Sequence, residues 1–212
     1  VFDVGIQTSR ALGRLAAGIP PRQAGPAGER DNGNGSLMRV LPVALWHQGS
    51  DQELALLSAE QSLPTHGHMR SRIACALYSL WVRCVLAGHR HPWEEAVGRL
   101  RLIAPALELD AQEMERVLDP ANAERVQGSG YVVDSLWSAR AAVLETSSFD
   151  ACVRRAVALG NDTDTTAAIA GGVAGAMYGR VGIPPKWQAD LRGNDILAHL
   201  LAALLSQGKL VR

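Results

Sequence analysis

Apolar residues recur at helical spacing along most of this chain, whereas the alternation of apolar and polar residues that is typical of a β-strand is missing throughout. Helices are therefore predicted over residues 3–17, 51–63, 69–86, 133–145, 151–159 and 196–205, and another within 37–45, where Pro42 fits best in the first turn. A further helix is predicted to begin at Pro92, and a short charged helix over 110–118 is expected to face solvent. No repeat of fixed period occurs. The sequence thus predicts an all-α fold.

Residues that begin or end helices stand at several of these boundaries. Ser50 and Glu53 form a capping-box pattern at the start of one helix. Gly160 can end another, because glycine enters the left-handed conformation without steric cost. The stretch 20–34 is rich in Pro, Gly and charged residues and is predicted to be a surface loop.

Two carboxylates and three hydroxyls occupy the five consecutive positions from Asp162 to Thr166, directly before a helix of small residues that runs to Gly179. Asp162 or Asp164 can cap that helix by accepting its free N–H groups, which is the usual role of an Asp at a helix start. Residues two apart do not share a helix face, so if both carboxylates point at one object, at least one of them lies in the turn. Carboxylates held that close repel each other unless a cation lies between them, and oxygen ligands suit Mg²⁺, Ca²⁺ or Mn²⁺. Capping and metal binding both remain open at this turn.

Three other loops that precede helices carry groups suited to a ligand. The turn from Gly33 to Ser36 offers backbone N–H groups that can hold an anion such as phosphate, although a plain Asn-Gly turn is the alternative. His66 either contacts a ligand or is an ordinary loop histidine, and no further His or Cys stands at a spacing that would complete a transition-metal site with it and His68. Tyr131 follows a glycine-hinged loop and offers an aromatic face. Together the four loops supply the parts needed to hold a nucleotide diphosphate sugar.

Composition and charge narrow the classes of function. Of the 212 residues, 47% are hydrophobic and 20% are charged, which is ordinary for a soluble globular protein with room for a sizeable core. The formal net charge is zero, so no global basic surface points to nucleic acid. The three cysteines show no CxxC spacing and fit a reducing compartment, from which a cytoplasmic location is predicted.

The sequence also shows neither a membrane-spanning segment nor a signal peptide. The longest candidate, Ile73 to Ala87, is broken by Arg83. The first residues have neither a signal-peptide pattern nor an initiator Met, so we expect the sequence to begin inside a longer protein. Neither a membrane nor nucleic acid is expected as a partner, and the oligomeric state is left open.

Four short motifs are more specific together than any one loop alone. They are Gly33-Asn34-Gly35-Ser36-Leu37-Met38-Arg39 with Pro42, Thr65-His66, Gly130-Tyr131-Val132 with Asp134, and above all Asp162-Thr163-Asp164-Thr165 with the small-residue helix to Tyr178-Gly179. In these motifs the chain resembles the ADP-ribosylglycohydrolase family, from Phe2 to about Pro185. The resemblance implies a single compact, orthogonal all-α domain over 1–212 whose central cleft holds two Mg²⁺ or Mn²⁺ ions.

The resemblance implies that Asp162, Asp164 and Thr165 are metal ligands, and that the two acids take part in catalysis through the metals. Family members also carry a Thr-Asp-Asp cluster near the N-terminus that supplies the other half of the metal shell, and no such cluster exists in this sequence. An Asp pair alone should bind Mg²⁺ weakly, because that ion needs several well-placed oxygens. We therefore expect that the N-terminal part of the family domain precedes Val1; the alternative is a shortened member with half a metal site.

The resemblance also implies a set of residues that touch the substrate. These are Asp31, Asn34, Gly35, Ser36, Met38, His66, Gly130 and Tyr131. The loop over 34–38 would surround the diphosphate and the ribose next to the reactive carbon, and Asp31 would contact the distal ribose. His66 would contact a ribose or a phosphate, and Tyr131 would place its ring near the ligand.

The function implied in this way is metal-dependent hydrolysis of the glycosidic bond between ADP-ribose and an arginine or serine side chain, or a related ADP-ribosyl conjugate. Such a reaction passes through a transition state of oxocarbenium character at the anomeric carbon. The expected partner is therefore ADP-ribose or an ADP-ribosylated protein. The alternative is a non-catalytic relative that binds ADP-ribose or a nucleotide, or that serves structurally as crystallin-like members do.

Overall fold

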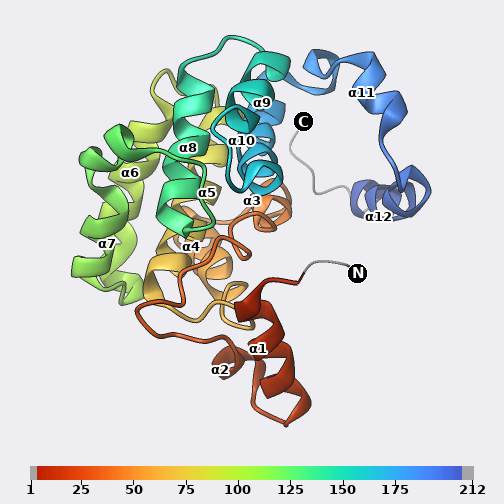
Figure 1. Cartoon of the computed structure of the whole chain (residues 1–212). Helices are drawn as coiled ribbons and strands as arrows, with labels where there is room; N and C mark the ends of the chain where they lie inside the picture. Colours follow the sequence, from red (N-terminus) through yellow and green to blue (C-terminus); the bar gives the residue numbers. More distant parts are fainter. Residues whose placement is uncertain (1–3, 207–212) are drawn as a thin grey trace.

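A computed structural model describes residues 4–206 of the chain, and within that range every element longer than one isolated bridge is a helix (Figure 1). The α-helices are α1 (Ile6–Ala16), α2 (Pro21–Ala24), α3 (Leu41–Trp46), α4 (Asp51–Glu60), α5 (Met69–Leu86), α6 (Pro92–Ile103), α7 (Ala111–Leu118), α8 (Val132–Leu144), α9 (Phe149–Val157), α10 (Thr163–Tyr178), α11 (Pro185–Asp190) and α12 (Asn194–Ser206). Three short 3₁₀ helices are η1 (Ala104–Leu107), η2 (Pro120–Arg125) and η3 (Arg180–Gly182). The predicted all-α fold is confirmed. Phe2, where the family resemblance begins, and the last six positions of the predicted domain lie outside the described residues.

Helix α5 is the centre of the domain, and the other helices gather around it (Figure 1). It packs against α3, α4, α6, α7, α8 and α10. Apolar and small side chains occur on every side of α5, and almost all of them are buried. A helix that is apolar all round is expected at the middle of a core. The predicted span 69–86 is the observed one.

The small residues of α10 allow this helix to lie close to α5. A Cβ built on Gly172 would be 2.3 Å from the hydroxyl oxygen of Tyr78, whereas the nearest atom to one built on Gly171 would belong to Val153, at 3.6 Å. The Tyr78 hydroxyl donates to the carbonyl oxygen of Ile169 in α10 over 3.0 Å. Burial raises the pKa of Tyr78, so the hydroxyl keeps its proton for this bond. The middle of α10 is thereby held against α5.

A chain of aromatic side chains fills the other end of the core. Trp93 packs edge-on against Trp81 and Trp137, with ring centroids 5.1 Å and 5.2 Å away. The indole N–H of Trp137 donates to the carbonyl oxygen of Val117 in α7 over 2.8 Å, and Val117 is fully buried. The prediction that the helix over 110–118 is solvent-facing is therefore wrong for its C-terminal turn, because that turn closes the core beside Trp137.

The remaining elements differ from the sequence prediction in small ways. The predicted surface loop over 20–34 contains one short helix, α2, and α11 was not predicted. The predicted last helix is α12, which stands apart from the bundle in Figure 1 and exposes 67% of Ile196 and 64% of Leu200. None of the helices within residues 4–206 is both long and apolar enough to cross a membrane.

Candidate active site

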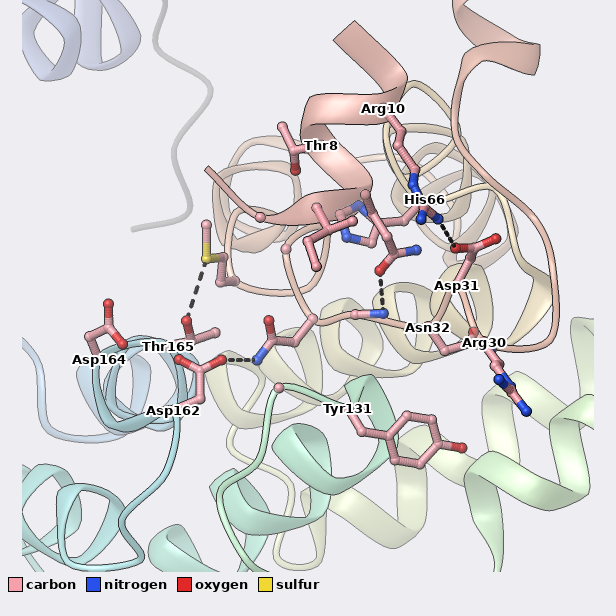
Figure 2. A pocket seen from close by; sticks show the side chains of 18 of the residues that line it. Thr8, Arg10, Arg30, Asp31, Asn32, His66, Tyr131, Asp162, Asp164 and Thr165 are labelled. Carbon is pink, nitrogen blue, oxygen red and sulfur yellow. Dashed lines mark hydrogen bonds and ion pairs between the residues drawn. The ribbon is translucent and has the colours of Figure 1, made fainter. Parts of the chain in front are cut away.

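A pocket of about 1120 Å³ opens where the four predicted loops meet, beneath the N-terminal half of α1 (Figure 2). Its lining residues are Gly5, Ile6, Gln7, Thr8, Arg10, Glu29, Arg30, Asp31, Asn32, Gly33, Asn34, Gly35, Met38, His66, Gly130, Tyr131, Asp162, Asp164 and Thr165. Sites for small molecules usually enclose about 300–1,000 Å³. The pocket is therefore large enough for a dinucleotide-sized ligand such as ADP-ribose.

The acidic turn forms one end of the pocket, where Figure 2 shows Asp162, Asp164 and Thr165 together. Asp162 takes the N-cap position of α10, but its side chain accepts no bond from the helix N–H groups. Its carboxylate Oδ2 instead accepts a hydrogen bond from Nδ2 of Asn34 over 2.8 Å. The capping role that the sequence left open for Asp162 is absent, because this carboxylate points away from its own helix and towards the neighbouring loop.

Backbone contacts hold the acidic turn in place. Gly160 has the predicted left-handed conformation, with a φ of +79°, but α9 already ends at Val157 with Ala158 as its C-cap, so Gly160 turns the chain shortly after the helix. The amide N–H of Asp162 then donates to the carbonyl oxygen of Gly128 over 2.8 Å. Gly128 also has a positive φ, and a Cβ there would lie 3.0 Å from the carbonyl oxygen of Gly160. The two glycines let the loops before α8 and α10 pack against each other.

The loop that precedes α3 is joined to the loop that precedes α8 by a short antiparallel bridge between Gly33 and Tyr131. Within it the amide of Asn34 donates to the carbonyl oxygen of Gly130 over 3.1 Å. The side-chain Nδ2 of Asn34 donates to Oγ of Ser135 as well as to Asp162, both over 2.8 Å. Asn34 therefore connects three of the four loops.

The predicted anion-binding turn is partly occupied by the protein itself. The amide of Gly33 donates to Oε1 of Gln7 over 2.6 Å, and the amide of Asn34 is bonded to Gly130. An anion could therefore use only the amides that follow, at Gly35 and Ser36. The Ser36 side chain is fully buried, and its Oγ accepts from Oγ of Ser62 over 2.8 Å. Unlike the other predicted substrate residues, Ser36 does not line the pocket.

His66 forms part of the pocket wall, and its ring is almost completely buried. Burial, and to a lesser extent the nearby Arg39 guanidinium, lower the pKa of His66 to about 4, while Asp31 raises it slightly. The imidazole is therefore neutral at physiological pH. A Cβ built on Gly35 would lie only 2.8 Å from the ring carbon Cε1, so this position needs glycine.

Tyr131 lies at the opposite end of the pocket from the acidic turn, and 40% of it is exposed (Figure 2). Its hydroxyl accepts from Nη1 of Arg70 over 3.2 Å, and the same guanidinium lies 5.9 Å from the ring centroid. Arg70 is fixed in turn by Glu29 and Glu113, at 2.9 Å and 2.6 Å. The ring is thus held by its hydroxyl end while a face remains available to a ligand.

Two groups of side chains could be considered for a metal ion. Asp162, Asp164 and Thr165 present two carboxylates and a hydroxyl, and only oxygen donors, which suits Mg²⁺ or Mn²⁺. Glu29, His68 and Glu113 also bring ligand atoms within 4.8 Å of one another. Arg70, however, already places its positive charge between those two carboxylates, and a metal ion there would be repelled. The acidic turn is the better site.

Asp31 and several residues that the sequence analysis missed form the rim beside α1. Asp31 lines the pocket as predicted, and its carboxylate forms an ion pair with Arg10 at 3.5 Å. Sequence reasoning identified α1 as a helix but assigned no function to Gln7, Thr8 or Arg10. Their polar character on one side of α1 was the available signal, but it does not distinguish a pocket wall from a solvated face.

Comparison with known proteins gave consistent results. The sequence model of the family described as "ADP-ribosylglycohydrolase" matches residues 1–211. The chain is 33% identical to the ADP-ribosylarginine hydrolase Tri1 of Pseudomonas putida (strain GB-1), covering 97% of this chain and 54% of that protein. It is 32% identical to the ADP-ribosyl-[dinitrogen reductase] glycohydrolase of Rhodospirillum rubrum, covering 78% and 53%, and 28% identical to the human ADP-ribosylhydrolase ARH3, covering 85% and 60%.

A solved structure described as an ADP-ribosylglycohydrolase-related protein complex superposes with a TM-score of 0.76 at 30% identity. The match covers 94% of this chain and 68% of that one. The chain spans about half the length of the curated relatives it matches.

Proposed function

Because the chain belongs to the ADP-ribosylglycohydrolase family, we propose that it is a metal-dependent hydrolase that cleaves the bond between ADP-ribose and an arginine or serine side chain, or a related ADP-ribosyl conjugate. The observation that carries the proposal is the single pocket in which the acidic turn, Asn34, His66 and Tyr131 meet. The similar proteins named above are hydrolases of ADP-ribosyl groups on arginine and dinitrogen reductase. Their names support the substrate class without fixing the linkage.

Asp162, Asp164 and Thr165 fit a divalent ion by the chemistry of their donors. A bound Mg²⁺ or Mn²⁺ would supply positive charge that orients ribose hydroxyls and lowers the pKa of a bound water. The hydrogen bond from Asn34 fixes one oxygen of Asp162 and leaves Oδ1 free of it. In Asp162 the turn before α10 therefore offers a carboxylate whose orientation is set before any ligand arrives, which reduces the entropy lost on binding.

The other residues of the pocket would position the substrate. With the distal ribose at the acidic turn, the diphosphate would pass Gly35 and the neutral His66, and the far end of the ligand would reach Tyr131. Hydrolysis then requires water to attack the anomeric carbon while the side-chain nitrogen or oxygen departs. Asp31 lies on the rim beside Arg10, away from the acidic turn (Figure 2), so in this arrangement it would face the far end of the ligand and not the distal ribose.

A second candidate is a protein that binds ADP-ribose without turnover. It is favoured by the small number of ligands at the acidic turn, since two carboxylates and a hydroxyl leave most positions of a Mg²⁺ ion to water. The two candidates differ in what the metal does. In the first, metal is needed for both binding and hydrolysis; in the second, ADP-ribose binds equally well without it.

The deciding experiment is release of ADP-ribose from synthetic ADP-ribosyl-arginine and ADP-ribosyl-serine peptides, each assayed with Mg²⁺, with Mn²⁺ and with EDTA. Calorimetric titration of ADP-ribose under the same three conditions accompanies it. Metal-dependent release from either peptide supports the hydrolase. Binding that ignores metal, without release from either peptide, supports the second candidate, and absence of both binding and release would reject both.

A further inference from the structure

The two ring nitrogens of His66 have different surroundings. Nδ1 lies 2.8 Å from Oγ1 of Thr65, the preceding residue. Nε2 lies next to the turn from Gly33 to Ser36, called the glycine loop from here on. A Cβ built on Gly35 would be 3.2 Å from Nε2, and one built on Gly33 would be 3.5 Å away. Among the described residues, Nε2 has no hydrogen-bond partner, and it faces the side from which Gly33 and Gly35 line the pocket.

Arg39 determines how the Thr65 hydroxyl is used. Its Nη2 donates to Oγ1 of Thr65 over 2.7 Å, and this direction is fixed because a guanidinium has no acceptor. The same guanidinium is held by Gln61, with Nε donating to Oε1 over 3.1 Å and Nη2 donating to the carbonyl oxygen over 2.9 Å. Arg39 therefore cannot easily turn away from Thr65.

A hydroxyl that accepts from a cation becomes a stronger donor and a weaker second acceptor, since hydrogen bonds in a chain polarise one another. The Thr65 proton has Nδ1 of His66 as its one acceptor within hydrogen-bond distance among residues 4–206. If Nδ1 carried a proton instead, two N–H groups would compete for one oxygen and the hydroxyl proton would have no acceptor. The favoured arrangement runs from Arg39 through Thr65 to an unprotonated Nδ1.

We propose that Arg39 and Thr65 fix the proton of His66 on Nε2, so that His66 presents an uncharged N–H donor to an oxygen of ADP-ribose. The inference deepens the proposed function and rests on it for the identity of the ligand. The oxygen belongs either to the diphosphate or to a ribose hydroxyl, since both accept such a bond. Thr65 and Arg39 are positioning residues in this arrangement, and His66 is the residue that touches the ligand.

The tautomer is tested in the ligand-free chain by ¹⁵N NMR of the histidine ring nitrogens at neutral pH, with His66 assigned by its loss in His66→Gln. The wild type is expected to show Nδ1 as the unprotonated nitrogen and Nε2 as the protonated one. Thr65→Val removes the hydroxyl at nearly constant volume and should give a mixture of tautomers, whereas Thr65→Ser should restore the wild-type pattern. Arg39→Met is a second route to the mixed state if Thr65→Val fails to fold, which circular dichroism reports.

The donor is tested by titrating ADP-ribose and ADP into the same variants. Loss of one hydrogen bond corresponds to about 3- to 10-fold weaker binding. We expect that loss for Thr65→Val with ADP-ribose and recovery for Thr65→Ser. An equal loss with ADP places the accepting oxygen on the part that both ligands share, the diphosphate or the adenosine ribose, and a loss confined to ADP-ribose places it on the distal ribose.

A proton on Nδ1 in the wild type, or an unchanged tautomer ratio in Thr65→Val, would overturn the inference. So would a shifted tautomer that leaves affinity for both ligands unchanged. If the wild type binds neither ligand, the proposed function and the ligand of His66 fail together, while the NMR spectra still decide whether Arg39 and Thr65 set the tautomer.

Discussion

Nδ2 of Asn34 lies 2.8 Å from Oδ2 of Asp162, although 128 positions separate the two residues in the chain. This bond joins the glycine loop to the acidic turn and orients one of the two carboxylates proposed to hold a metal. It also explains why Asp162 does not cap its own helix, since the carboxylate is turned towards the pocket. The relationship leads to a direct test of what the acidic turn does.

Replacing both acids, Asp162→Ala with Asp164→Ala, is expected to abolish metal-dependent binding of ADP-ribose while helix content stays nearly unchanged, because the N-cap residue Asp162 makes no capping hydrogen bond to α10. Asp110 provides the matched control, since its Oδ1 does accept from the amide of Glu113 at the start of α7 over 2.8 Å. Asp110→Ala should cost about 1 kcal/mol of stability and leave binding intact. Calorimetry and thermal denaturation measure the two effects. Unfolding of the double variant at room temperature would show that the acids are mainly structural.

Tyr131→Ala is expected to weaken ADP-ribose binding by roughly 1–3 kcal/mol if a base stacks on the ring. Tyr131→Phe separates the ring from its hydroxyl, which accepts from Arg70. The Phe variant should keep most of the affinity, and titration calorimetry distinguishes the two. Unchanged affinity in Tyr131→Ala would show that the ring does not contact the ligand. Equal losses of affinity in both variants would assign the effect to the hydroxyl.

Gly172→Ala is expected to destabilise the protein by about 1–3 kcal/mol, because the added methyl would meet the Tyr78 hydroxyl at 2.3 Å and push α10 away from α5. Gly171→Ala, one position earlier, meets Val153 at an ordinary 3.6 Å and should be neutral or stabilising by up to about 1 kcal/mol. Urea denaturation of the two variants gives the comparison. Similar stabilities would mean that α10 does not depend on this close approach.

Acid should destabilise the fold through His66. Burial and the charge of Arg39 lower the pKa of His66 from 6.5 to about 4, against a smaller opposite effect of Asp31. Between these values the unfolded chain binds the proton and the native protein does not, so the free energy of unfolding falls as the pH drops from about 6.5 to about 4. The full effect is on the order of 3 kcal/mol.

Denaturant titrations at a series of pH values measure this dependence. His66→Gln removes the titrating group and should flatten the curve between about pH 6.5 and 4. A variant that retains the wild-type slope over this range would show that other groups produce the acid sensitivity.

Much of the fold followed from local patterns in the sequence. The limits of α5 were predicted correctly because its apolar run is bounded by a turn on each side, and the capping box of Ser50 and Glu53 marked the start of α4. The small residues before Gly179 indicated close packing, but not which helix approached. That information depends on Tyr78, a residue whose position in α5 gives no local sign that it meets Gly172.

The four loops of the pocket were also identified from the sequence, because their glycines, acids and aromatic stand at helix starts. The details within them were not. Ser36 lies in the same motif as Asn34, yet its side chain points into the core, where it is hydrogen-bonded to the Ser62 hydroxyl. Gln7 and Arg10 line the pocket because α1 packs over the glycine loop, where Gln7 bonds Gly33 and Arg10 pairs with Asp31. No spacing of residues in the sequence predicts this packing.

The bridge between Gly33 and Tyr131 has a consequence for the order in which the molecule folds. Asn34 and Ser135, which bond beside it, are 101 positions apart, and the whole of α3 to α7 lies between them. Closing so long a loop is entropically costly unless the intervening helices have already condensed, and contacts distant in sequence tend to slow folding. We therefore expect helices α3 to α7 to pack together early and the ligand pocket to form last. A nascent chain released before α10 is synthesised would then bury most of its hydrophobic core but would lack the pocket.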